Sequence, residues 1–243
     1  MTRPILILRA GDAVAEVRAA RGDFPRWIEE SAADAWKGGW HAHDVRTDEP
    51  LPAVGEVAAF VITGSSSSVT ERAPWMLRAE EYVRTIVAAG VPLLGICFGH
   101  QLMAQALGGL VAKNPRGREL GTVTFERTVE DDALFARLPS AFVVNASHVD
   151  SVVRLPEGAR VLGKTTLEPV SAFVAGKSAW GVQFHPEFDG DVVRGYVRAR
   201  STAMKSEGLE PEKALASAAD APHGREVLRR FVGLVVERRG QGG

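Results

Sequence analysis

Cys97 is the single cysteine of this chain, and it lies in the segment Gly95-Ile96-Cys97-Phe98-Gly99-His100-Gln101. A nucleophilic side chain with a glycine two residues before it and another two residues after it is typical of a sharp turn between a strand and a helix. Such a turn lifts the side chain out of the sheet and directs the next backbone N–H groups at the atom under attack. A helix that begins directly behind a thiol also favours the thiolate, because its N-terminus carries a partial positive charge. The pattern therefore predicts a cysteine nucleophile.

A cysteine nucleophile needs a base that takes its proton and a third group that orients the base. The segment His185-Pro186-Glu187 supplies an imidazole and a carboxylate on either side of a rigid proline. It follows the apolar run 180–184, so it lies at the carboxyl end of an expected strand, where open α/β sheets place their sites. The same chemistry needs N–H donors for a negatively charged oxygen. The backbone of Phe98 and that of Gly64-Ser65 are the predicted donors, because both follow neighbouring strands.

The elements that must position these groups alternate in the first half of the chain. Strands are expected at 5–8, 36–46, 57–62 and 91–94, with helices around 14–18, 74–87 and 102–107. This alternation predicts a parallel sheet that is covered on both faces. Short strands are then expected at 111–113, 121–127, 141–145, 160–164, 170–175 and 179–184, followed by two helices after residue 191. The predicted fold class is α/β, an open and mostly parallel sheet flanked by helices with antiparallel strand additions.

Composition limits the classes of function. The net charge of -1 argues against a broad surface for nucleic acid or an anionic membrane, and one cysteine excludes a disulfide framework or a cysteine-rich zinc site. The apolar run at the start is too short for a signal peptide, and no later run approaches membrane-spanning length. We expect a cytoplasmic protein without cofactor or metal. It is expected to form a single domain over 1–243, with a core at about 4–200 and C-terminal helices at about 201–239.

Three segments resemble the class I (triad) glutamine amidotransferase family: Gly95 to Gln101, Ile62-Thr63-Gly64-Ser65, and Gln183-Phe184-His185-Pro186-Glu187-Phe188. The chain is most similar to stand-alone members that resemble the amidotransferase domain of GMP synthase, and the resemblance covers roughly residues 4–200. It implies a flavodoxin-like sheet. It also implies hydrolysis of the side-chain amide of glutamine to glutamate and ammonia through a γ-glutamyl thioester.

The resemblance also implies roles by motif position. Cys97 would be the nucleophile, His185 the general base and acid, and Glu187 the partner that orients the histidine. Gly64 and Phe98 would donate to the oxyanion. The segment 145–150 resembles a part of the family that lines the glutamine pocket, so the expected substrate-binding residues are Gln101, Ser65, Ser147, His148 and Val149.

Two features separate the chain from the biosynthetic members of the family. Its loop after the third strand reads Gly64-Ser65-Ser66-Ser67-Ser68, where those members more often have a second glycine and a proline. It also has no Gly-x-x-x-x-Gly-Lys phosphate loop, so ammonia would need a separate synthetase or another acceptor protein. Plant γ-glutamyl peptidases share the motifs, so hydrolysis of γ-glutamyl conjugates is one alternative. A non-catalytic regulatory or binding member of the fold is the other.

Overall fold

The computed structural model describes residues 3–241 and is built around a nine-stranded sheet in the order β2-β1-β3-β4-β11-β10-β9-β6-β7. Its parallel part consists of β2 (Trp40–Asp44), β1 (Ile5–Arg9), β3 (Ala59–Ile62), β4 (Leu93–Ile96) and β11 (Ala179–Val182). Its antiparallel part consists of β10 (Ala172–Ala175), β9 (Arg160–Lys164), β6 (Glu119–Arg127) and β7 (Ala141–His148). The predicted α/β class with antiparallel additions is confirmed.

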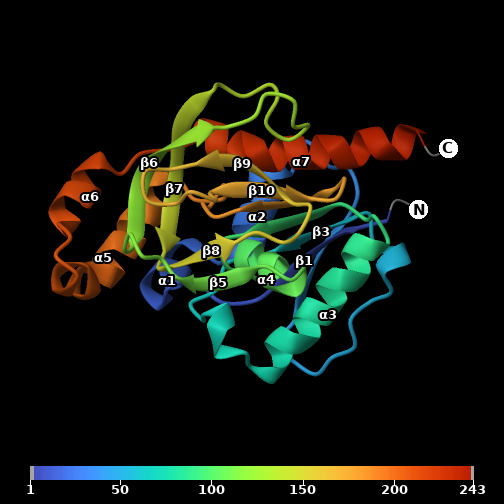
Figure 1. Ribbon diagram of the computed structural model, residues 1–243, viewed down its shortest axis with the longest axis horizontal. Coiled ribbons are helices and arrows are strands. Elements are labelled where there is room, and N and C mark those ends of the chain that lie inside the picture. Colours follow the sequence, from blue (N-terminus) through green and yellow to red (C-terminus); the bar gives the residue numbers. More distant parts are fainter. Residues whose placement is uncertain (1–2, 242–243) are drawn as a thin grey trace.

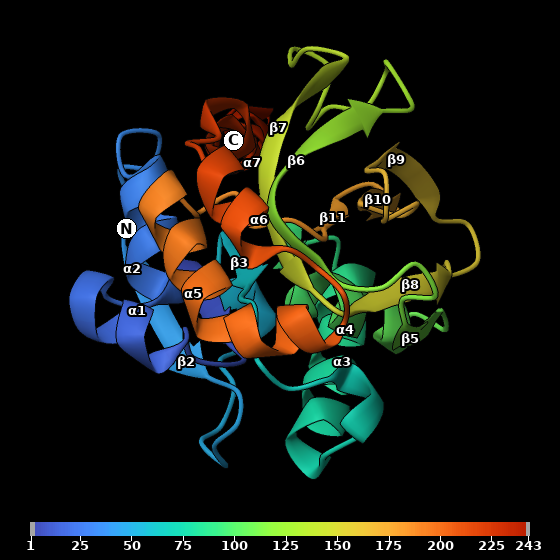
Figure 2. The ribbon, with the colours of Figure 1, turned by 90° about the vertical axis from the view of Figure 1, so that its left-hand side faces the viewer.

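Apolar side chains form one core on each face of the sheet, because successive residues of a strand point to opposite faces. On β1, Ile5 and Ile7 belong to one core, whereas Leu6 and Leu8 belong to the other. The first core is covered by α1 (Ala15–Arg21), α2 (Phe24–Ala32), α5 (Gly190–Ser206) and α7 (Pro222–Gln241). The second core is covered by α3 (Pro74–Ala88) and α4 (Phe98–Ala106). Figure 2 shows α1, α2 and α5 on one side of β3, with α3 and α4 on the other.

Helix starts fix where the loops around the site begin and end. At α2 the Asp23 carboxylate accepts from the Phe24 N–H, and a proline occupies the first turn. At α5 the Asp189 carboxylate accepts from the Val192 N–H at 2.8 Å. Both caps satisfy N–H groups that have no partner inside the helix. As a result the segment 183–189 is held between the end of β11 and the start of α5.

The structure differs from the expected elements in five places (Figure 1). Helix α2 and strand β8 (Asp150–Arg154) were not predicted. Strand β5 (Leu110–Lys113) pairs with β8 in a separate two-stranded sheet, because only three residues separate it from α4 and keep it beside that helix. Strand β11 runs parallel to β4, since the hairpin from β10 reverses the chain direction. After residue 190 there are three helices, because α6 (Pro211–Ser217) intervenes before α7.

Candidate active site

Cys97 lies in the turn between β4 and α4, and its backbone angles are φ +50° and ψ -100°. Among residues 3–241 the other non-glycine residue with positive φ is Arg72. Such a conformation costs on the order of 1–3 kcal/mol and persists only where neighbouring contacts enforce it. Here the Cys97 N–H donates to the carbonyl of Val182 at 2.8 Å, and the Cys97 carbonyl accepts from the Gln101 N–H at 3.1 Å. The turn is therefore anchored to β11 on one side and to α4 on the other.

The positions two residues before and two residues after Cys97 have no room for a side chain. A Cβ on Gly95 would lie 2.5 Å from the carbonyl oxygen of Gly99, and a Cβ on Gly99 would lie 2.5 Å from that of Ile62. Neither glycine has a positive φ. Their role is to let α4 start against the backbones of β3 and β4, which brings the Cys97 thiol to the carboxyl ends of those strands.

His185 and Glu187 form a buried pair beside Cys97. The Nδ1 of His185 lies 2.7 Å from Oε1 of Glu187, and both side chains are almost completely buried. The His185 N–H donates to the carbonyl of Asn145 on β7 at 2.7 Å. Its ring stacks on Phe188 with 4.0 Å between ring centroids, and the nearly parallel ring of Phe24 has its centroid 6.0 Å away. Backbone, carboxylate and ring stacking together fix the imidazole in one orientation.

Electrostatics keep a proton on this imidazole. Burial alone would favour the neutral ring, but the negative charges of Glu187 and Cys97 and hydrogen bonds to both outweigh it and raise the pKa of His185 to about 10. The site therefore holds an imidazolium between a carboxylate and the sulfur. That arrangement places a proton donor next to the Cys97 sulfur.

Phe98 and Gly64, the two predicted oxyanion donors, lie at the start of α4 and beside His185. Phe98 is the first residue of α4, so its N–H has no partner within the helix. The backbone of Gly64 lies beside the imidazole ring, since a Cβ there would lie 2.8 Å from Cε1 of His185. Thr63 holds this loop: its hydroxyl accepts from the Ala10 N–H at 3.0 Å and donates to the Gly64 carbonyl at 2.9 Å.

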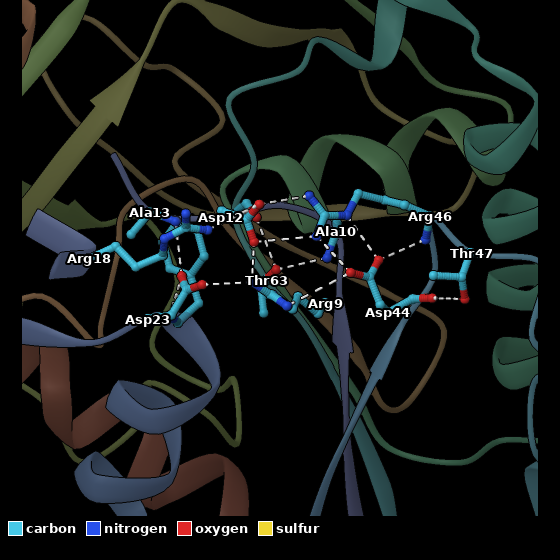
Figure 3. A network of polar contacts seen from close by, with 12 residues as sticks. Arg9, Ala10, Asp12, Ala13, Arg18, Asp23, Asp44, Arg46, Thr47 and Thr63 are labelled. Carbon is cyan, nitrogen blue, oxygen red and sulfur yellow. Dashed lines mark hydrogen bonds and ion pairs between the residues drawn. The ribbon is translucent and has the colours of Figure 1, made fainter. Parts of the chain in front are cut away.

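A network of ion pairs supports the neighbouring loop at the end of β1 (Figure 3). Asp12 accepts from Arg9 and from Arg46, the latter at 3.1 Å, and lies 3.5 Å from Arg18. Its hydrogen bonds to Arg46 outweigh partial burial and hold the pKa of Asp12 below its usual value. Asp23 accepts from Arg9 and from the Ala13 N–H, both at 2.9 Å. The network fixes residues 9–14 as a wall of the site.

A cavity of about 360 Å³ opens above the Cys97 turn. Most residues predicted for the site line it, namely Ser65, Cys97, Phe98, Gln101, Ser147, His148, Val149 and His185. Gly64 and Glu187 lie behind the surface, both in contact with His185. The structure thus brings together side chains from β4, α4, β7 and the segment after β11.

Two of the predicted binding residues use their polar atoms inside the protein. Nε2 of Gln101 donates to the carbonyl of Asp150 at 2.9 Å and to Oε1 of Gln183 at 3.0 Å, which leaves its own Oε1 for a ligand. The ring of His148 lies 3.0 Å from the Asp150 carbonyl through Nδ1 and 3.1 Å from Glu119 through Nε2. The His148 ring therefore belongs to a buried polar network, because both of its nitrogens lie near protein oxygens. Its ring nitrogens are thus engaged within the protein.

Several residues that line the cavity were not predicted from the sequence. They are Asp12, Val14, Phe24, Ser66, Ser67, Ser68, Glu71, Arg118, Asp150, Tyr196 and Arg200. Tyr196 and Arg200 are four residues apart on α5 and so share one face of that helix. The spacing is visible in the sequence, but the packing of α5 over the cavity is not.

Residues 3–241 contain no group of three or more His, Cys, Asp or Glu side chains arranged to hold a metal ion. No helix in the same part of the chain is both long enough and apolar enough to cross a membrane.

Comparisons with known proteins identify the family of the chain. Residues 39–196 match the family model "Glutamine amidotransferase class-I". A glutamine amidotransferase-like protein of Schizosaccharomyces pombe is 28% identical over 225 residues, covering 86% of this chain and 89% of the relative. The GMP synthase of Aeropyrum pernix is 40% identical over 141 residues, but these span 56% of this chain and only 26% of that enzyme. Gamma-glutamyl peptidase 4 of Arabidopsis thaliana is 32% identical over 138 residues, 55% of each chain.

Solved structures share the fold. A glutamine amidotransferase of Thermotoga maritima superposes with a TM-score of 0.78 at 22% identity, over 98% of this chain and 100% of that one. A GMP synthase subunit of Thermoplasma acidophilum gives a TM-score of 0.69 at 18% identity, over 99% and 98% of the two chains. The family model matches more than half of this chain, so the chain belongs to the class-I glutamine amidotransferase family.

Proposed function

We propose that this chain hydrolyses a γ-glutamyl amide, with the side-chain amide of glutamine as the first expected substrate, through a thioester on Cys97. The observation that carries the proposal is the placement of a strained cysteine turn beside a buried His185–Glu187 pair, whose Nδ1–Oε1 distance is 2.7 Å. A structural cysteine needs neither the backbone strain nor an imidazolium next to it.

The first half of the proposed reaction forms the thioester. The Cys97 thiolate adds to the amide carbon, and the negative charge moves onto the oxygen, where the N–H groups of Gly64 and Phe98 stabilise it. His185 gives its proton to the amide nitrogen, the carbon–nitrogen bond breaks, and the amine leaves. His185 is then neutral and the γ-glutamyl group is bound to sulfur.

The second half releases the acid. Neutral His185 takes a proton from a water molecule, whose oxygen adds to the thioester carbon. Collapse of this intermediate breaks the carbon–sulfur bond, releases glutamate and restores the thiolate beside the imidazolium. Glu187 holds the ring in the required tautomer throughout.

Labelling by a glutamine-like diazo-ketone tests the proposal. We expect intact mass to show one adduct, peptide mapping to place it on Cys97, and Cys97→Ala to lose both the adduct and glutamate release while retaining the far-ultraviolet spectrum. An unlabelled wild-type protein, or a Cys97→Ala variant with wild-type turnover, would contradict the assigned nucleophile and favour a non-catalytic member of the fold.

If glutamine is the substrate, the ammonia must reach an acceptor. The relatives include GMP synthases, and one structural neighbour is a GMP synthase subunit. By that likeness we propose that the partner is a separate synthetase chain. Co-purification from the native source, with stimulated glutamine hydrolysis in the complex, is the expected result.

The second candidate is a γ-glutamyl peptidase. It is favoured by the likeness to the Arabidopsis peptidase and by a second cavity that adjoins the cavity at Cys97. The two cavities share Ser65, Ser66 and Ser67, which we call the serine loop. Turnover of glutamine and of a γ-glutamyl dipeptide by the same preparation separates the two candidates, since faster glutamine hydrolysis would count against the peptidase.

A further inference from the structure

The catalytic cavity has two sides that differ in their relation to His185. The first side, which we call the glutamyl side, consists of Gln101, Ser147 and Asp150. All three line the cavity: Sγ of Cys97 lies 3.7 Å from the Ser147 carbonyl, and Gln101 donates to the Asp150 carbonyl. This side suits the part of the substrate that stays on sulfur.

The second side, which we call the departure side, consists of Phe24, Tyr196 and Arg200. The His185 ring lies 6.0 Å from the Phe24 ring and 6.5 Å from the Tyr196 ring, measured between centroids. Arg200 is one helical turn beyond Tyr196 and lines the same cavity. In the proposed reaction the leaving amine takes its proton from His185, so the side of the cavity beside these rings suits it.

Arg200 is the cation of the cavity that has no acidic partner. Within residues 3–241 no carboxylate oxygen lies within 4.0 Å of its guanidinium. The other arginine and histidine side chains lining the cavity each have one: Arg118 pairs with Glu207, His148 with Glu119, and His185 with Glu187. An unpaired guanidinium facing an active site is suited to an anionic part of a ligand, and carboxylates are its preferred planar partner.

Asp12, which also lines the cavity, does not supply that partner. Its two oxygens are already engaged by Arg9 and Arg46, with Arg18 at 3.5 Å. Glu16 lines only the outer, adjoining cavity and is not within ion-pair distance of Arg200. The charge on Arg200 is therefore left for a ligand.

There is also room for such a ligand. A second cavity of about 420 Å³ shares Arg200, Val14 and the serine loop with the catalytic one and continues along α1, where Arg18 lines it. Ammonia needs no space of this kind. A leaving group with a backbone of its own does.

We propose that Arg200 binds a carboxylate carried by the leaving group, so that γ-glutamyl amino acids or peptides are substrates alongside glutamine. The inference rests on the proposed γ-glutamyl amide hydrolysis. In thioester formation the carbon–nitrogen bond breaks, His185 supplies the proton, and the amino acid departs with its carboxylate held at Arg200.

Three substrates test the assignment in the full-length chain: γ-glutamylglycine, γ-glutamylglycinamide and glutamine. The first two differ only in the charge of the leaving group. We expect wild type to show a kcat/KM for γ-glutamylglycine about 10- to 100-fold above that for the glycinamide, as a charge-assisted hydrogen bond permits. Arg200→Gln is expected to reduce this ratio to within about three-fold, and Arg200→Lys to keep part of it. Arg198→Gln, at an exposed position of the same helix, is the matched control with the wild-type ratio.

The same ratio is expected in the dissociation constants that calorimetry gives for the two dipeptides on Cys97→Ala, which separates binding from turnover. Equal kcat/KM for both dipeptides in wild type, or a ratio unchanged in Arg200→Gln, overturns the assignment. An equal fall for all three substrates in Arg200→Gln also overturns it, because it would place the α-carboxylate of the glutamyl group at Arg200. Failure of the proposed function is a different result, namely an unlabelled Cys97 and no hydrolysis of any of the three.

Discussion

Gly64→Ala tests whether the imidazole of His185, the proposed base, is held immobile. The added Cβ would lie 2.8 Å from Cε1 of His185 and 3.4 Å from Cζ of Phe24. Ordinary contact begins at about 3.4 Å, so the ring must retreat by about 0.6 Å. Its retreat is opposed by Phe188, stacked at 4.0 Å, and by the 2.7 Å hydrogen bond to Glu187.

The expected loss follows from that displacement. A misplacement of about 1 Å costs on the order of 100-fold in rate, so a shift of about 0.6 Å predicts a kcat lower by about 10- to 100-fold. Overpacking costs about 1–3 kcal/mol, which for a chain of this size lowers Tm by about 2–12 °C. Glutamate release and thermal unfolding measure the two effects.

Gly55→Ala is the matched control, because a Cβ at that exposed position meets nothing within 4 Å. It is expected to keep the wild-type rate and Tm. Wild-type turnover in Gly64→Ala would refute the reasoning, whether or not Tm falls, since the rate would then not depend on the position of the ring.

Three further predictions concern the same site. Glu187→Gln should lower kcat by about 10²- to 10⁴-fold with little change in fold, and it should lower the pKa of His185, which NMR titration can follow; an unchanged pKa would contradict the assigned pair. Gly99→Ala should lower Tm, because its Cβ would lie 2.5 Å from the Ile62 carbonyl oxygen. Gly233→Ala, inside α7 with nothing within 4 Å of the added Cβ, should raise the free energy of unfolding by about 0.5–1 kcal/mol. Equal shifts of the urea midpoint in the two variants would contradict this prediction. The pKa of His185 is raised to about 10, so the stability that its protonation contributes is fully present below about pH 6.5 and is lost as the pH rises through about 10. We expect kcat/KM to fall over the same upper range. A kcat/KM that still rises at pH 11 would contradict this prediction.

The sequence was sufficient to predict that Cys97 and His185 lie close together. Cys97 and His185 each follow an apolar strand, and the structure shows that β4 and β11 are adjacent and parallel, so both residues lie at the same edge of the sheet. The glycine spacing around Cys97 predicted the turn correctly. Helix α2 had a readable signal that was missed, because Phe24, Trp27 and Ile28 recur at helical spacing behind the Asp23 cap.

Other parts of the site depend on tertiary contacts that spacing does not contain. Arg200 faces the cavity only because α5 packs over it, and the ring nitrogens of His148 are engaged because Glu119 on β6 happens to oppose β7. Likewise Asp12 and Arg46 come from loops after different strands, and their ion pair exists only once β1 and β2 have paired. Such long-range pairs leave no trace in a local motif.

The run from His185 to Arg200 has a consequence for how the protein can evolve. His185, Glu187 and Arg200 all belong to one short stretch, most of it helix α5. A single inserted residue before Arg200 would rotate it by about 100° about the helix axis and remove it from the cavity. With the role proposed for Arg200, substitution at position 200 would change selectivity without moving His185 or Glu187, whereas an insertion within α5 before Arg200 would remove its side chain from the cavity.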